Sequence, residues 1–131
     1  MLMHTSGFLC FLDKGDFRHQ KAAKYFISAR SRLTHNYVLA ELVALAESRN
    51  FSREITLDFL SEISEDSQTE IIWVSENLTE RSIKFLRNRK DKDWSLSDAV
   101  SFLLMEEYGI SEALTTDHHF EQAGFIKLLD S

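Results

Sequence analysis

Residues 93–120 read DWSLSDAVSFLLMEEYGISEALTTDHHF, and this stretch decides how the rest of the chain is interpreted. Asp98 lies near the start of a predicted helix with apolar residues at helical spacing, and Gly109 is a typical helix stop. A short run with β propensity, residues 113–116, follows and ends at Asp117. In α/β proteins, helix N-termini and strand C-termini meet in a crevice at one edge of the sheet. The stretch therefore predicts two carboxylates close together, which is the beginning of a cation site.

Segments with strand character alternate with helical segments along the whole chain. Strands are expected at residues 1–5, 32–34, 70–74, 113–116 and 125–129, and helices at 6–12, 16–30, 36–49, 52–63, 77–88 and 95–109. This alternation predicts an α/β fold, a three-layer α/β/α sandwich around a parallel sheet. The chain contains no linker, internal repeat or low-complexity tract, so a single domain over residues 1–131 is expected.

Local signals refine some of these elements. Asp16 and Asn36 are predicted to cap the helices that they begin, and Asn77 begins a pattern that resembles a capping box. The run EIIWV at residues 70–74 is the clearest strand, and its apolar character predicts that both of its faces are covered.

Composition limits the class of function. A net charge of −6 argues against broad, passive binding to a polyanion, although a metal ion can neutralise an acidic site. The single cysteine, Cys10, permits no intrachain disulfide and fits a reducing cytosol, so a cytoplasmic location is expected. No apolar run approaches the roughly 18 residues of a membrane span, so no membrane association is expected.

Three acids are candidates for chemistry, namely Glu41, Asp98 and Asp117. Each lies at the end or in the first turns of a predicted element, among apolar neighbours, where a solvated surface acid is less expected. Carboxylates that are brought together repel one another, and a divalent cation relieves this repulsion. Oxygen ligands of this kind suit Mg²⁺ or Mn²⁺, which can activate water and stabilise charge on a phosphoryl group.

Each of these acids also has a purely structural interpretation. Ser95 and Asp98 have the spacing of a capping box, in which the carboxylate satisfies backbone donors. Asp117 can be a turn residue, and Glu41 can be an acid favoured by the dipole of a helix start. The spacing alone leaves the cation site and these structural roles open.

Four segments together resemble the PIN-domain nucleases of the VapC-like, toxin–antitoxin type; they are HTSGF at 4–8, THNYVLAE at 34–41, WSLSDA at 94–99 and LTTDHHF at 114–120. The resemblance implies a parallel α/β/α sandwich, a divalent metal and hydrolysis of RNA phosphodiester bonds by an endoribonuclease. It places the family's acids at Glu41, Asp98 and Asp117, and gives Asp93 at most an outer role. It also implies an antitoxin partner and a homodimer.

The sequence departs from the family pattern at position 4. The family pattern has Asp-Thr-Ser or a close variant at the end of the first strand, where this chain has His4, Thr5 and Ser6. His4 can be a substitute ligand that favours Mn²⁺, Co²⁺ or Zn²⁺ over Mg²⁺, a mark of lost catalysis, or an engineered or erroneous residue. The rival function is therefore a catalytically impaired PIN-like module that binds RNA or a protein partner without cleaving. Thr5 and Ser6 can bind substrate or orient a water molecule, or cap the next helix.

One basic segment interrupts the acidic chain and precedes the helix that bears Asp98. It comprises Arg81, Lys84, Arg87, Arg89, Lys90 and Lys92. Arg87 and Arg89 are candidates for RNA binding, although an acidic partner segment or solvent alone would also suit this surface. His35, His118 and His119 lie near the candidate acids in sequence, and one of them can contact phosphate or act as an outer ligand. The stronger expectation is that His118 and His119 are exposed after the strand. A phosphoacceptor signalling domain is a remoter possibility, because its acceptor acid would stand where His4 is.

Overall fold

Five parallel strands form one sheet in the computed structural model, which describes residues 1–131. The strand order is β3-β2-β1-β4-β5, so the strand nearest the N-terminus lies in the centre. The strands are β1 (Leu2–Met3), β2 (Arg32–His35), β3 (Thr69–Ile72), β4 (Glu112–Leu114) and β5 (Ile126–Lys127). Leu2 is paired with Leu33 of β2 on one side and with Ala113 of β4 on the other.

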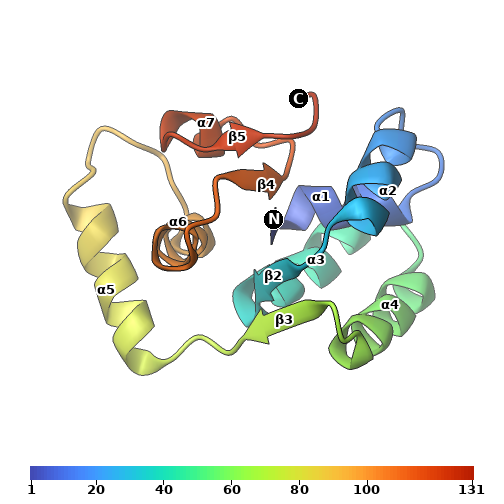
Figure 1. Ribbon diagram of the computed structural model, residues 1–131, viewed down its shortest axis with the longest axis horizontal. Helices are drawn as coiled ribbons and strands as arrows, with labels where there is room; N and C mark the ends of the chain where they lie inside the picture. The colour runs from blue at the N-terminus through green and yellow to red at the C-terminus, as the bar shows by residue number, and fades with distance from the viewer.

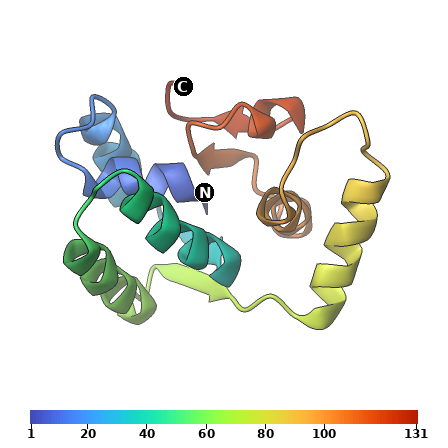
Figure 2. The ribbon, with the colours of Figure 1, turned by 180° about the vertical axis from the view of Figure 1, so that it is seen from behind.

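Helices cover both faces of the sheet (Figure 1 and Figure 2). One face carries α1 (Thr5–Leu12), α2 (His19–Ser28), α3 (Asn36–Ser48) and α4 (Arg53–Glu65). The other carries α5 (Glu76–Arg87) and α6 (Leu96–Tyr108), and the short α7 (His119–Gln122) joins β4 to β5. The predicted α/β/α architecture is confirmed. None of the helices combines the length and the apolar character needed to span a membrane.

The alternation of side chains along β1 separates two hydrophobic clusters. Leu2 belongs to the cluster under α5 and α6, and Met3 to the cluster under α1, α3 and α4; both are fully buried. Gly7 in α1 lies so close to β4 that a β-carbon would be 1.9 Å from the Leu114 carbonyl oxygen. That carbonyl accepts the His4 backbone N–H at 3.2 Å, so the absence of a side chain at Gly7 lets α1 begin directly over the junction of β1 and β4.

Several local predictions are confirmed. Ser52 caps α4 and accepts the Ile55 N–H at 3.2 Å. Ser95 caps α6 with a complete capping box, and Gly109 ends that helix in the left-handed conformation at φ 65°.

Other local predictions are wrong. Asn36 does not cap α3, because its Oδ1 accepts the Val74 N–H at 2.7 Å and ties the helix to the end of β3. Ser75, not Asn77, caps α5. Asp16 binds Arg18, and α2 starts only at His19.

The strand β3 differs from its prediction in burial. It lies at the edge of the sheet and is only half buried, and Trp73 just beyond it is 71% exposed. The apolar run therefore does not mark a strand covered on both faces.

Candidate active site

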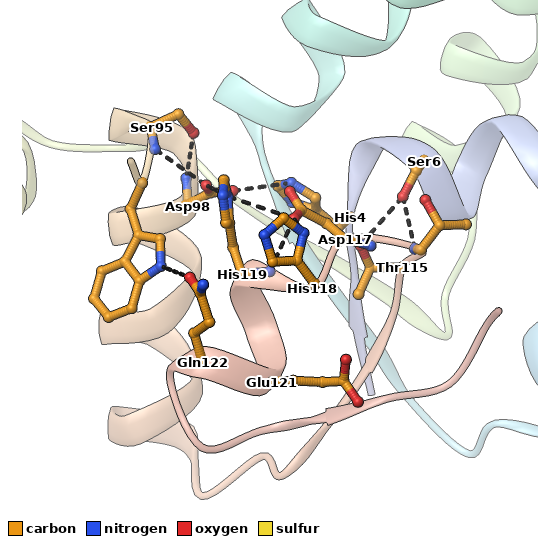
Figure 3. Close-up of polar contacts among 12 residues, drawn as sticks. His4, Ser6, Ser95, Asp98, Thr115, Asp117, His118, His119, Glu121 and Gln122 are labelled. Carbon is orange, nitrogen blue, oxygen red and sulfur yellow. Dashed lines mark hydrogen bonds and ion pairs between the residues drawn. The ribbon is translucent and has the colours of Figure 1, made fainter. Parts of the chain in front are cut away.

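The candidate site lies where β1 and β4 end, beside the N-terminal end of α6 (Figure 3). Residues from distant parts of the chain point toward one another there, because the two strands are neighbours in the sheet. A cavity of about 610 Å³ opens at this edge. Its lining includes every acid singled out from the sequence together with the segment at positions 4–6, namely His4, Thr5, Ser6, Glu41, Asp93, Asp98 and Asp117.

Asp98 is buried and has two roles. Its Oδ2 accepts the Ser95 N–H at 3.0 Å, which closes the capping box of α6, and its Oδ1 lies 3.3 Å from His4 Nε2. Burial of the Asp98 side chain disfavours its charged form, but hydrogen bonds from His4, Ser95 and His119 outweigh burial, so the pKa of Asp98 lies below its ordinary value. The cap interpretation and the site interpretation are therefore both correct for this residue.

Asp117 closes the turn after β4 and also faces the cavity. Its Oδ1 accepts the His119 N–H at 2.9 Å, and its own N–H donates to Thr115 Oγ1 at 3.0 Å. Ligand atoms of His4, Asp98 and Asp117 all lie within 4.8 Å of one another. The structure thus brings together two of the three predicted acids and His4.

Glu41 on α3 lines the same cavity but stands apart from this cluster. It is not among the side chains whose ligand atoms lie within 4.8 Å of one another. Thr5 Oγ1 donates to Glu41 Oε1 at 2.9 Å and holds the carboxylate in place. Ser6 has a different task, since its Oγ lies 3.1 Å from Thr115 Oγ1 and accepts the Thr116 N–H at 2.9 Å. It ties the start of α1 to the end of β4.

The exposure predicted for His119 is wrong, and its position agrees instead with the alternative of an outer role beside the acids. Its Nδ1 lies 3.0 Å from Asp98 Oδ2 and 3.4 Å from Asp117 Oδ1, so one imidazole contacts both carboxylates (Figure 3). The neighbouring His118 is exposed as expected. Phe120 is fully buried, with its ring centroid 4.7 Å from that of His4. The sequence does contain a signal for this role of His119, because His119 lies two residues after Asp117 and begins a short helix.

The remaining candidates have different surroundings. Arg49, at the end of α3, lines the cavity and was not anticipated. Arg87 and Arg89 are exposed and lie outside the cavity lining. His35 is fully buried and its Nε2 lies 2.8 Å from Ser101 Oγ; burial lowers its pKa to about 3, so its imidazole is neutral near pH 7.

The donor set fits a divalent cation. Two carboxylates supply hard oxygen ligands, and the His4 imidazole adds a nitrogen ligand that suits Mn²⁺, Co²⁺ or Zn²⁺ better than Mg²⁺. The other His4 nitrogen, Nδ1, is buried without a hydrogen-bond partner. No disulfide is possible, and Cys10 lies in the core cluster, away from this lining.

Comparison with known proteins gives a consistent family. Residues 1–126 match the PIN domain. The chain is 28% identical over 129 residues to the 23S rRNA-specific endonuclease VapC20 of Mycobacterium tuberculosis, in strain CDC 1551 / Oshkosh and in strain H37Rv, covering 98% of this chain and 97% of the relative. The crystal structure of M. tuberculosis VapC20, described as a sarcin–ricin loop cleaving toxin, aligns with a TM-score of 0.86 at 27% identity and covers 98% of each chain.

Proposed function

We propose that this chain, which belongs to the PIN-domain family, is a metal-dependent endoribonuclease that hydrolyses RNA phosphodiester bonds. The observation that carries the proposal is the group formed by His4, Asp98 and Asp117, whose ligand atoms lie within 4.8 Å of one another in an acidic cavity. The fold around this group aligns over 98% of its length with a toxin described as cleaving the sarcin–ricin loop. The rival, a module that binds without cleaving, rests only on the missing acid at position 4.

In this proposal Asp98, Asp117 and His4 hold the cation, and Glu41 acts from a greater distance. A divalent cation held there supplies an activated water molecule and neutralises charge on the phosphate under attack. Thr5 fixes one oxygen of Glu41, and the other has no partner within the protein, so it is free to accept a hydrogen bond from water. His119 donates toward Asp98 and keeps that carboxylate oriented.

The relatives support the proposed substrate class and the proposed partners. VapC20 is named as a 23S rRNA-specific endonuclease, so RNA is the proposed substrate and a sarcin–ricin loop hairpin is the first RNA to test. A toxin role predicts an antitoxin that occupies or masks the site, and the resemblance to such toxins favours a homodimer. The Mg²⁺ or Mn²⁺ requirement is likewise part of the proposal.

The decisive experiment replaces the two buried acids conservatively. Asp98→Asn and Asp117→Asn keep side-chain acceptors for the capping box and the turn but remove the charge. Both variants are expected to lose RNA cleavage in Mn²⁺ or Mg²⁺, and the wild type is expected to lose it in EDTA. Asp91→Asn, at an exposed acid outside the cavity lining, serves as the matched control and should cleave normally.

Two outcomes would overturn the proposal. Equal cleavage by the wild type and both variants, with contaminating nuclease excluded, would place the chemistry elsewhere. RNA binding by the wild type without any cleavage in either metal would favour the binding module.

A further inference from the structure

One wall of the active-site cavity is a single face of α3. Glu41, Ala44, Leu45, Ser48 and Arg49 all line the cavity, and their spacing of three and four residues places them on one side of the helix. Two of these side chains, alanine and serine, are small. The wall is therefore open between its two charged ends, with a carboxylate at one end and a guanidinium at the other.

The end of α3 fixes the position of Arg49. Asn50 adopts the left-handed conformation at φ 56°, and its N–H donates to the Glu47 carbonyl at 3.1 Å. The Phe51 N–H donates to the Ala46 carbonyl at 2.9 Å, which completes a Schellman-type ending. Arg49 is the C-cap residue, eight positions after Glu41, which corresponds to about 12 Å along the helix axis.

The charge of the cavity makes Arg49 distinctive. It is the only lysine or arginine among the lining residues, which include four acids. No carboxylate lies within 4.0 Å of its guanidinium, and its side chain donates no hydrogen bond within the protein. A guanidinium binds phosphate through two parallel hydrogen bonds, and this one is unused.

We propose that Arg49 binds a backbone phosphate near the one that is cut, with the RNA strand following α3 from Glu41 to Arg49. The inference rests on the proposed nuclease function and adds a substrate-binding residue to it. A polyanion that enters an acidic cavity needs a positive contact along the cavity wall. Because Arg49 stands at the far end of the wall from Glu41, it acts on binding and register and not on the reacting atoms.

The test compares Arg49→Gln and Arg49→Lys with Arg30→Gln. Arg30 is exposed just before β2, at the opposite edge of the sheet, and also forms no ion pair. Cleavage of a sarcin–ricin loop hairpin is measured over a series of KCl concentrations.

Arg49→Gln is expected to raise KM about tenfold to a hundredfold with little change in kcat. It should also reduce the slope of log KM against log salt by about 1. Arg49→Lys should retain the salt slope but not the full affinity, and Arg30→Gln should match the wild type.

A second measurement locates the phosphate. RNAs that carry one methylphosphonate, which removes the charge of one phosphate, are compared position by position. For the wild type, a methylphosphonate at one position near the cleavage point should lower the RNA affinity most strongly. A methylphosphonate at that same position should not lower the RNA affinity of Arg49→Gln. If the wild type is active and Arg49→Gln has the same KM and salt slope, the role of Arg49 is overturned but the nuclease function is not. A wild type that cleaves no RNA would overturn the nuclease function and this inference with it.

Discussion

His4 stands where the resemblance to PIN-domain nucleases predicts an aspartate, and its surroundings show how a histidine fits there. The imidazole Nε2 occupies a place facing Asp98, and the ring packs on Phe120 in the core. An aspartate in its place would add a third carboxylate to the pair formed by Asp98 and Asp117. Repulsion among the three would then be relieved only by a bound cation.

His4→Asp is therefore expected to bind Mg²⁺ more tightly than the wild type, by about tenfold or more, with a smaller gain for Mn²⁺. Isothermal titration calorimetry with each metal, and melting temperature with and without metal, measure the effect. His4→Asn is the matched control, because it removes the imidazole without adding charge. Equal Mg²⁺ affinity for His4→Asp and His4→Asn would contradict the expectation.

At this scale the sequence singled out the acids and the segment at positions 4–6, but it left the role of His119 open. Asp98 and Asp117 could be found because an acid at the end of an apolar element is unusual. The contact of His119 with both carboxylates could not be predicted, because it depends on the short turn of α7. Arg49 was equally hidden, since its place on the cavity wall depends on where α3 ends.

The junction of β1, α1 and β4 is the element on which the site depends most. Gly7→Ala would press a methyl group onto the Leu114 carbonyl, a backbone atom that cannot move away without breaking the pairing of the two strands. We expect the free energy of unfolding to fall by about 3 kcal/mol or more. Urea denaturation measures it. Gly15→Ala, in an open turn, is the control, and equal midpoints for the two variants would refute the argument.

A second element-scale prediction concerns the edge where β2 and β3 begin. The buried Arg32 side chain donates to Asp66 Oδ2 at 2.5 Å, to the Phe26 carbonyl at 2.6 Å and to Thr69 Oγ1 at 3.0 Å. The hydrogen bond from Arg32 lowers the pKa of Asp66 to about 2. Because the pKa is lower in the folded state than in the unfolded state, this ion pair stabilises the fold above about pH 4. Its contribution is lost as the pH falls from about 4 to about 2.

Asp66→Asn is expected to reduce the free energy of unfolding by about 1–2 kcal/mol at pH 7, and the difference from the wild type should shrink toward pH 2. Urea denaturation at pH 7, 4 and 2.5 measures this. Asp58→Asn, at an exposed acid without a salt-bridge partner, is the control. A difference that stays constant over this pH range would count against the ion pair as its cause.

The types of element were more predictable than their places in the sheet. Strand and helix periodicities gave the α/β alternation, and Ser52, Ser95 and Gly109 marked helix ends correctly. The exposure of β3 was not predictable in this way, because an apolar run does not reveal whether its strand becomes central or lies at an edge. The predictions that Asn36 and Asn77 cap helices are wrong. Asn36 Oδ1 accepts the Val74 N–H instead, and Ser75 Oγ accepts the Leu78 N–H at the start of α5.

For the whole molecule, the balance of charge sets how RNA can approach. The net charge is −6, yet Arg87 and Arg89 form part of an exposed basic surface at the end of α5, just before the helix that bears Asp98. Reversal of both to glutamate is expected to weaken RNA binding and to reduce its salt dependence. Fluorescence anisotropy with a labelled hairpin over a KCl series measures both quantities.

The control reverses Lys21 and Lys24 on α2, which changes the net charge equally on the other face of the sheet. Weaker binding only in the Arg87 and Arg89 variant would assign that surface to RNA. Identical losses in the two variants would indicate a general effect of charge, and no loss in either would exclude this path.

The central position of β1 has a consequence for how the protein is made. β1 leaves the ribosome before the other four strands of the sheet, yet one of its two neighbours, β4, is supplied by residues 112–114. Until those residues emerge, the nascent chain lacks both the strand that fixes His4 and the carboxylate of Asp117. The nascent chain therefore carries no complete group of His4, Asp98 and Asp117 until residue 117 has cleared the exit tunnel.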